Sequence, residues 1–335
     1  KEWTDKIISE LKEMPNVIVK NRSQVFGYYD HNMLVMSERI SDHLPKTKKY
    51  SPKQRLWYIR AKEVIISSGS IERPLVFGNN DTPGVILSSA AKEYLKIYGV
   101  LVGKNPLVFT NNDSGYTTAI EFKKNGISPI VLDKRKNPSS EIINEAKNLN
   151  IDIKFSHVVV AAKGYKKVKS ADIAKISEDK KELSQIENIS CDCICVSGFW
   201  TPTIHLASQS GNKTKFNEEI DAFIPSQPKQ NETTLGSAKG VFTLEETLKT
   251  SFEKGFELSK KITKKENKIA TPSVLEKKSS VHDKFWCVPL PKGANYKRFL
   301  DFQNDVAVTD VQLALREGYR SIEHVKRYTT LGMAT

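Results

Sequence analysis

Apolar positions along the chain follow either the strand period or the helix period, and their order predicts an α/β fold. Short apolar runs rich in β-branched residues, at 63–67 and 191–196, are typical of buried parallel strands. Between them, residues 106–132 have the pattern strand, helix, strand, which is the order of a βαβ unit. Residues 1–13 have apolar side chains at helical spacing and predict a helix at the start of the chain.

Each parallel-strand run leads into a serine followed by glycine, Ser68–Gly69 and Ser197–Gly198. Glycine permits a close approach between the backbone and a bound dinucleotide. Two such strands around a long insertion predict two interleaved dinucleotide-binding domains of the disulfide-reductase-like kind, followed by a small helical segment. We expect the first domain to comprise residues 1–68 and 196–262, and the inserted domain to comprise residues 69–195. A linker at 263–284 and a C-terminal segment at 285–335 would follow.

The inserted domain lacks the glycine-rich turn with which such folds hold a pyrophosphate. Its first strand leads into Thr110–Gly115, and no Gly-x-Gly occurs anywhere in the chain. Asn111, Asn112 and Asp113 would block a pyrophosphate, although Asp133 ends the second strand at the usual distance. We expect this domain to be structural and to bind neither NAD nor NADP by itself.

A second turn that contains glycines, Gly236–Gly240, precedes a helix predicted from Thr243. Thr243 and Glu246 have the spacing of a capping box, in which each side chain bonds to the backbone amide of the other residue. The amides and the positive dipole of such a helix start favour an anionic or polar part of a cofactor. This turn is therefore a candidate contact for a dinucleotide.

The formal net charge of +13 raises the question of nucleic-acid binding. Lysines are dispersed along the chain, and their densest run, at 260–268, contains no interleaved aromatic residue. We therefore expect no nucleic-acid partner and interpret the charge as solvation, with an anionic partner subunit as the alternative.

No apolar run is long enough to cross a membrane, and the start of the chain has no apolar signal segment. We expect a soluble, cytoplasmic protein without a membrane partner. Because the chain lacks an initiator methionine and opens on a helical pattern, we also expect it to be an internal piece of a longer protein.

The four cysteines do not form the pattern of a disulfide framework. Cys191, Cys193 and Cys195 would share one face of a strand, about 7 Å apart along the chain. Such thiols suit core packing; zinc is the alternative, but no His or Cys pair follows at knuckle spacing. The six histidines are scattered, so we predict no metal site and no catalytic residue in this chain.

Five motifs, in order along nearly the whole chain, resemble the alpha subunit of heterotetrameric sarcosine oxidase. These motifs are Tyr28–Asn32, Gly69–Phe77, Asn79–Val85, Phe109–Ser114 and Asp301–Asp305. The resemblance implies an oxidoreductase acting on CH–NH donors, with its catalytic centre on a partner subunit. In that family, oxidative demethylation converts sarcosine to glycine and hydrogen peroxide, with methylene-tetrahydrofolate or formaldehyde as the one-carbon product.

The resemblance also implies the cofactors and partners. NAD would lie in the alpha subunit without a catalytic role, FAD in the beta subunit, and FMN between the two, with gamma and delta subunits as further partners. A Gly-x-Gly-x-x-Gly fingerprint is expected before residue 1. A folate-binding, aminomethyltransferase-like domain that uses tetrahydrofolate is expected after residue 335.

By the same resemblance, NAD contacts in this chain lie on one strand, at one strand end and at the glycine turn: Val25, Ser68, Gly69, Gly236, Ser237, Ala238 and Thr243. The alternative for Val25 is a core strand residue. Related flavoproteins have Gly-Asp, whose carboxylate grips the flavin ribityl chain, where this chain has Gly236–Ser237. That difference favours NAD at this turn.

Residues 306–335 are similar to the helical part of bacterioferritin-associated ferredoxins, which hold a two-iron cluster through four cysteines. Asp301–Gln303 stands where that motif has its first Cys-x-Cys, so we expect no cluster. Two alternatives remain for the chain as a whole. One is a subunit of a related flavin-dependent amine or imino-acid dehydrogenase, for which cluster cysteines would be expected, and the other is a non-catalytic scaffold subunit.

Overall fold

The computed structural model describes residues 2–47, 49–264 and 282–333, so most of the predicted linker at 263–284 lies outside the described residues. The chain forms two compact units. Unit 1 comprises residues 1–70 and 202–274, and unit 2 comprises residues 71–201 and 275–335. The chain leaves and re-enters unit 1 through two short strands that pair with each other, β5 (Ser70–Glu72) and β14 (Trp200–Pro202).

Unit 1 contains an antiparallel sheet of β1 (Ser23–Tyr29), β2 (Met33–Arg39) and β3 (Gln54–Arg60). The inner face of this sheet packs into a small core through Tyr28 and Leu34, which lie against Val64, Ile66 and Ala207. The predicted first helix is present as α1 (Glu2–Glu13), although none of its side chains is buried.

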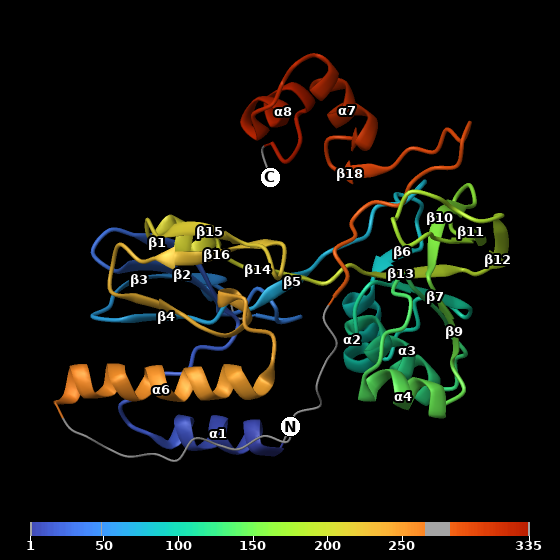
Figure 1. Ribbon diagram of the computed structural model, residues 1–335. Helices are drawn as coiled ribbons and strands as arrows, with labels where there is room; N and C mark the ends of the chain where they lie inside the picture. The colour runs from blue at the N-terminus through green and yellow to red at the C-terminus, as the bar shows by residue number, and fades with distance from the viewer. Residues whose placement is uncertain (1, 48, 265–281, 334–335) are drawn as a thin grey trace. The chain divides into compact units, whose positions relative to one another are not determined.

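A parallel pair of strands, β4 (Val64–Ile66) and β17 (Glu232–Thr234), brings two distant parts of unit 1 together, with Ile66 opposite Thr234. Figure 1 shows β4 between the three-stranded sheet and α6 (Leu244–Thr263). The remaining elements of unit 1 are α5 (His205–Gln209), β15 (Lys213–Asn217), β16 (Ala222–Gln227) and the 3-10 helix η1 (Gly236–Lys239).

Unit 2 is built on a five-stranded parallel sheet in the order β6-β13-β7-β8-β9. Its strands are β6 (Val85–Leu87), β7 (Pro106–Thr110), β8 (Ile130–Asp133), β9 (Asp152–Phe155) and β13 (Cys193–Ser197). The helices α2 (Ser88–Tyr98), α3 (Ser114–Lys124) and α4 (Glu141–Asn148) belong to the same unit. Every residue of β7 and β13 is buried, which explains their continuous apolar runs and confirms the α/β prediction.

Three antiparallel strands, β10 (His157–Lys163), β11 (Ser170–Lys175) and β12 (Glu187–Ser190), share the core of this sheet. The C-terminal segment follows with β18 (Phe299–Asp301), β19 (Val306–Ala307), α7 (Val308–Arg316) and α8 (Ile322–Thr329). The Asn80 side chain holds this segment, because it donates to Phe299 O at 2.9 Å and accepts from Phe299 N at 2.8 Å.

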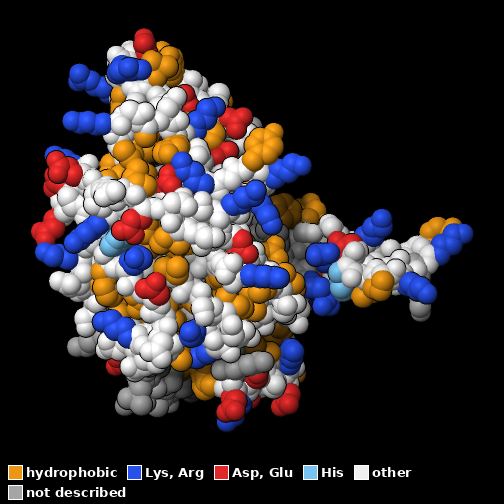
Figure 2. All heavy atoms as spheres, turned by 90° about the vertical axis from the view of Figure 1, so that its right-hand side faces the viewer, with side chains coloured by type: hydrophobic (Ala, Val, Ile, Leu, Met, Phe, Trp, Pro, Cys, Tyr) orange, Lys and Arg blue, Asp and Glu red, His pale blue; other side chains and the backbone are white. Residues whose placement is uncertain are grey.

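Charged side chains are mixed on the surface. On the face shown in Figure 2, lysine and arginine side chains are spread among acidic, polar and apolar ones, and no single basic patch dominates it. Within the described parts of the chain, no helix is long and apolar enough to cross a membrane.

Candidate dinucleotide-binding site

The carboxyl ends of β4 and β17 bring two of the predicted contacts together. Parallel pairing places both strand ends at one edge, where Leu235 N donates to Ile66 O at 2.9 Å. Beyond this bond, a Cβ atom placed on Gly69 would lie 4.0 Å from Ser237 Oγ. Gly69 and Gly236 are 167 residues apart along the chain. The fold nevertheless brings Ser68–Gly69 and Gly236–Ser237 together in one place.

Gly69 makes the sharp turn at the end of β4. Its φ of +77° lies in the left-handed region, which side chains other than glycine adopt at a cost. The turn is fixed from both sides by Thr203, because Ser68 Oγ donates to Thr203 O at 2.8 Å and Thr203 N donates to Gly69 O at 3.0 Å. Gly69 thus presents a backbone without a side chain, which permits the close approach of a dinucleotide.

The second turn is the 3-10 helix η1, closed by Gly240. Gly240 N donates to Ser237 O at 3.1 Å, and Val241 N donates to Gly236 O at 3.2 Å. Ala238 is fully buried within this turn, side chain and backbone alike. Ser237, which is partly exposed, is the side chain of this turn that lies nearest Gly69.

Thr243 stands at the N-cap of α6 with extended backbone angles, φ −86° and ψ 141°. Its hydroxyl makes no capping hydrogen bond, so the predicted capping box is wrong. The helix starts through the backbone alone, because Thr247 N donates to Thr243 O at 3.1 Å. The exposed acids Glu245 and Glu246 in the first turn reduce the positive potential that a bound phosphate would meet there.

Val25 lies on β1 as a half-buried residue packed against the core that contains Tyr28 and Ile66. This packing agrees with its alternative interpretation as a core strand residue.

In unit 2, the turn after β7 is closed by its own side chains. Asn112 Oδ1 accepts from Ser114 N at 2.8 Å, and Asn112 Nδ2 donates to Ser197 O at 3.0 Å. Asn111 Nδ2 donates to Asp283 O at 2.8 Å. These bonds occupy the space in which a pyrophosphate would approach a glycine-rich turn.

Beside this turn, the positively charged Arg135 forms ion pairs with two buried carboxylates. Its guanidinium lies 2.8 Å from Asp113 Oδ1 and 2.7 Å from Asp133 Oδ2, and all three side chains are buried. Burial alone would lower the pKa of Arg135, but the bonds to Asp133 and Asp113 raise it above its ordinary value. Asp133, which a nucleotide-binding fold would use for a ribose, also accepts from Tyr116 OH at 2.7 Å.

The role of Arg135 in this cluster was not predicted from the sequence. A signal was present, because Lys134-Arg135-Lys136 directly follows the strand that ends in Asp133. What the sequence did not reveal is that Asp113, 22 residues earlier, lies within reach of the same guanidinium.

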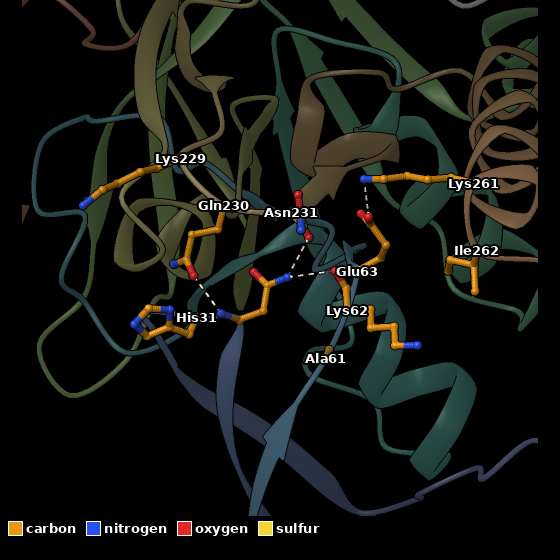
Figure 3. Close-up of a pocket in the computed structure, with 10 residues that line it drawn as sticks. His31, Ala61, Lys62, Glu63, Lys229, Gln230, Asn231, Lys261 and Ile262 are labelled. Atoms are coloured by element: carbon orange, nitrogen blue, oxygen red, sulfur yellow. Dashed lines mark hydrogen bonds and ion pairs between the residues drawn. The ribbon is translucent and has the colours of Figure 1, made fainter.

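A pocket of unit 1 lies at the other edge of the parallel pair, beside the amino ends of β4 and β17. It has a volume of about 700 Å³ and is lined by His31, Asn32, Ala61, Lys62, Glu63, Lys229, Gln230, Asn231, Lys261 and Ile262. Figure 3 shows Lys261 directed at Glu63, whereas Lys229 points away from the other labelled side chains. Ligands of parallel sheets usually bind at the carboxyl ends of the strands, which is the opposite edge of this pair.

The cysteines of the 191–195 run are buried packing residues, as predicted, but only two of them share a face. Cys193 and Cys195 share one face of β13, with their sulfur atoms 3.8 Å apart. Cys191 precedes the strand and packs in a different core cluster, so the prediction that all three share a face is wrong. Among the described residues, no three His, Cys, Asp or Glu side chains are grouped so that they could hold a metal ion.

The C-terminal segment matches a known family of domains. Residues 295–335 match the sequence model of the sarcosine oxidase A3 domain.

Similarity to known proteins extends over the rest of the chain. Sarcosine oxidase subunit alpha of Rhizobium meliloti (strain 1021) is 34% identical over 97% of this chain and 32% of its own length. Sarcosine oxidase subunit alpha of Corynebacterium sp. (strain P-1) is 32% identical over 99% of this chain and 35% of its own length. The chain thus spans about a third of the length of these curated relatives.

Solved structures agree on the fold. L-proline dehydrogenase from P. horikoshii superposes with a TM-score of 0.57 at 18% identity, over 99% of this chain and 59% of that one. The flavoprotein disulfide reductase RclA from Escherichia coli superposes with a TM-score of 0.50 at 16% identity, over 77% of this chain and 54% of that one. The predicted dinucleotide-binding fold is confirmed. Over nearly all of its length the chain is similar to about a third of a sarcosine oxidase alpha subunit.

Proposed function

We propose that this chain is part of the alpha subunit of a heterotetrameric sarcosine oxidase, an oxidoreductase that demethylates sarcosine to glycine. In this proposal the complex forms hydrogen peroxide and passes the one-carbon unit to tetrahydrofolate or releases it as formaldehyde. The chain contributes a non-catalytic NAD scaffold and contacts to the beta, gamma and delta subunits. FAD and FMN are held mainly by the partner subunit, and the whole assembly is cytoplasmic.

The observation that carries this proposal is the meeting of Ser68–Gly69 with Gly236–Ser237 at one edge of a parallel strand pair. Two left-handed glycines, Gly69 and Gly236, leave the backbone bare where a dinucleotide would pass. Ser237 brings no carboxylate that would repel a phosphate or grip a flavin ribityl chain. Val25 and Thr243 complete the proposed set of NAD contacts, and the buried Ala238 packs behind the turn.

The edge of β4 that faces away from β17 supports the proposal that a further segment completes this domain. Among residues 2–47, 49–264 and 282–333, β4 pairs with β17 alone, and Ile65 is 49% exposed. A parallel pair is normally part of a larger sheet that is covered on both faces. We propose that a glycine-rich strand from outside this chain occupies the open edge and supplies the missing half of the NAD site.

A second candidate function is a structural role for the inserted domain, and Arg135 favours it. A guanidinium held between Asp113 and Asp133 replaces the ligand of a nucleotide-binding fold with internal ion pairs. In this view unit 2 serves subunit contact, and a related amine dehydrogenase subunit is the remaining alternative for the whole chain.

The substitution Ser237→Asp tests the site in the full-length subunit assembled with its partners. A carboxylate near Gly69 would repel the NAD pyrophosphate, and we expect retention at least about tenfold weaker than in the wild type. Ser237→Ala is the matched control and should retain NAD. Ala238→Asp is unsuitable as a test, because Ala238 is fully buried and an aspartate there would disturb the fold itself.

The readout is the amount of NAD, FAD and FMN released from denatured protein. Loss of NAD with both flavins retained supports the proposal. Undiminished NAD together with lost FMN would show that the turn contacts a flavin instead.

A further inference from the structure

Residues 282–288, which we term the strap, cover the carboxyl edge of β7 and β8 in unit 2. Backbone bonds fasten it at both ends: Asp283 N donates to Asn111 O at 3.0 Å, and Val288 N donates to Val76 O at 2.8 Å. In its middle, Val76 N donates to Trp286 O at 2.8 Å. The strap is thus a defined part of unit 2 that crosses the edge where nucleotide-binding folds receive their ligand.

The Asp283 carboxylate on this strap is held by two lysines. Lys180 Nζ lies 2.6 Å from Asp283 Oδ1, and Lys134 Nζ donates to Asp283 Oδ2. Lys180 also donates to the backbone carbonyl of Lys284 at 2.7 Å. The two ammonium groups therefore converge on one small anion.

Lys134 is placed for this role by the sheet. It directly follows Asp133 at the end of β8, and its backbone N donates to Thr110 O of β7 at 2.9 Å. Its side chain is only 6% exposed, so its ammonium needs an anionic partner to offset burial. Burial lowers the pKa of Lys134, whereas the bond to Asp283 opposes that shift.

We infer that Lys134 and Lys180 form an anion-binding site for a phosphoryl group, and that Asp283 of the same chain occupies it as an internal ligand. The neighbouring turn at Asn111–Asp113 is filled by its own side chains, so a whole dinucleotide does not fit. A single phosphoryl group needs only the space of the Asp283 carboxylate and the two lysines. The site therefore fits a single phosphoryl group in place of the Asp283 carboxylate.

An internal ligand has a strong advantage over a free one. A group tethered beside its site acts at an effective concentration on the order of millimolar or higher. Free phosphate at ordinary concentrations should consequently fail to enter the wild-type site, and removal of the Asp283 carboxylate should open it.

The experiment titrates inorganic phosphate into the full chain at low ionic strength and measures heat by calorimetry. We expect no measurable binding to the wild type. Asp283→Ala should bind phosphate with an affinity at least about tenfold above the weakest that the calorimeter detects. The double variant Asp283→Ala/Lys180→Ala should lose this binding. Glu178→Ala is the matched control, since it removes an exposed acid that pairs with Lys136 on the same chain and should leave the site closed.

Asp283→Asn retains the shape of the side chain and provides a second test if the alanine variant does not fold. Folded Asp283→Ala and Asp283→Asn variants that bind no phosphate would overturn the inference. Equal binding by the wild type and Asp283→Ala would also overturn it, because Asp283 would then not occupy the site.

Discussion

At the scale of single residues, Arg135 determines how the inserted domain differs from a nucleotide-binding domain. The substitution Arg135→Gln leaves the buried carboxylates of Asp113 and Asp133 without their shared cation. Breaking a buried pair in this way should lower the free energy of unfolding by about 3–5 kcal/mol. Urea denaturation followed by circular dichroism measures this loss, and Lys136→Gln, at an exposed ion pair, is the control that should change nothing measurable. A loss no larger than that of the control would show that the two carboxylates need no cation.

The same scale shows what could be predicted from the sequence. Gly69 and Gly236 were found because a left-handed turn at a strand end has few alternatives to glycine. Ala238 and Thr243 were predicted as NAD contacts from the glycine turn, but the burial of Ala238 and the missing cap bond of Thr243 depend on the packing of α6 and η1. Side-chain partners across 20 or more residues, such as Arg135 with Asp113, follow from the fold and not from spacing.

At the scale of elements, two helix starts make a matched comparison. The Asp310 carboxylate in α7 accepts from Ala307 N at 2.8 Å, whereas Thr243 at the start of α6 makes no side-chain cap. We expect Asp310→Ala to cost about 1 kcal/mol of stability and Thr243→Ala less than about 0.5 kcal/mol. The denaturation midpoints of the two variants measure these losses of stability. Equal losses would contradict the assigned caps.

The loops of the C-terminal segment meet at Asp301, which stands where the similar ferredoxin motif has a cysteine. Its carboxylate accepts from Asn304 Nδ2 at 3.0 Å and from Gly332 N at 2.7 Å. The Asn304 side chain, followed by the Gly332 amide, lowers the pKa of Asp301 from 3.8 to about 2. A carboxylate thus joins two loops of this segment.

Because the pKa of Asp301 is lower in the folded state, its contribution to stability is present above pH 3.8 and is lost as the pH falls through about 2. The amide shift of Gly332, followed by nuclear magnetic resonance, should titrate with a midpoint near 2, and Asp301→Asn should abolish this titration. A midpoint near 3.8 would contradict the assigned contacts.

Elements themselves were largely predictable. The βαβ unit followed from continuous apolar runs that are buried on both faces, and β7 and β13 show that burial. The pairing of β4 with β17 was not apparent, because strands of three residues far apart in sequence carry too few side chains to specify a partner.

At the scale of the whole molecule, the relatives are about three times as long as this chain, and the proposed NAD site uses a segment outside it. The most direct test is an electron cryo-microscopy structure of the full-length subunit assembled with its partners. The account predicts NAD density against Ser68–Gly69 and Gly236–Ser237, with a strand paired to the open edge of β4. Dinucleotide density against Asn111–Asp113, or a flavin at Gly236, would contradict it.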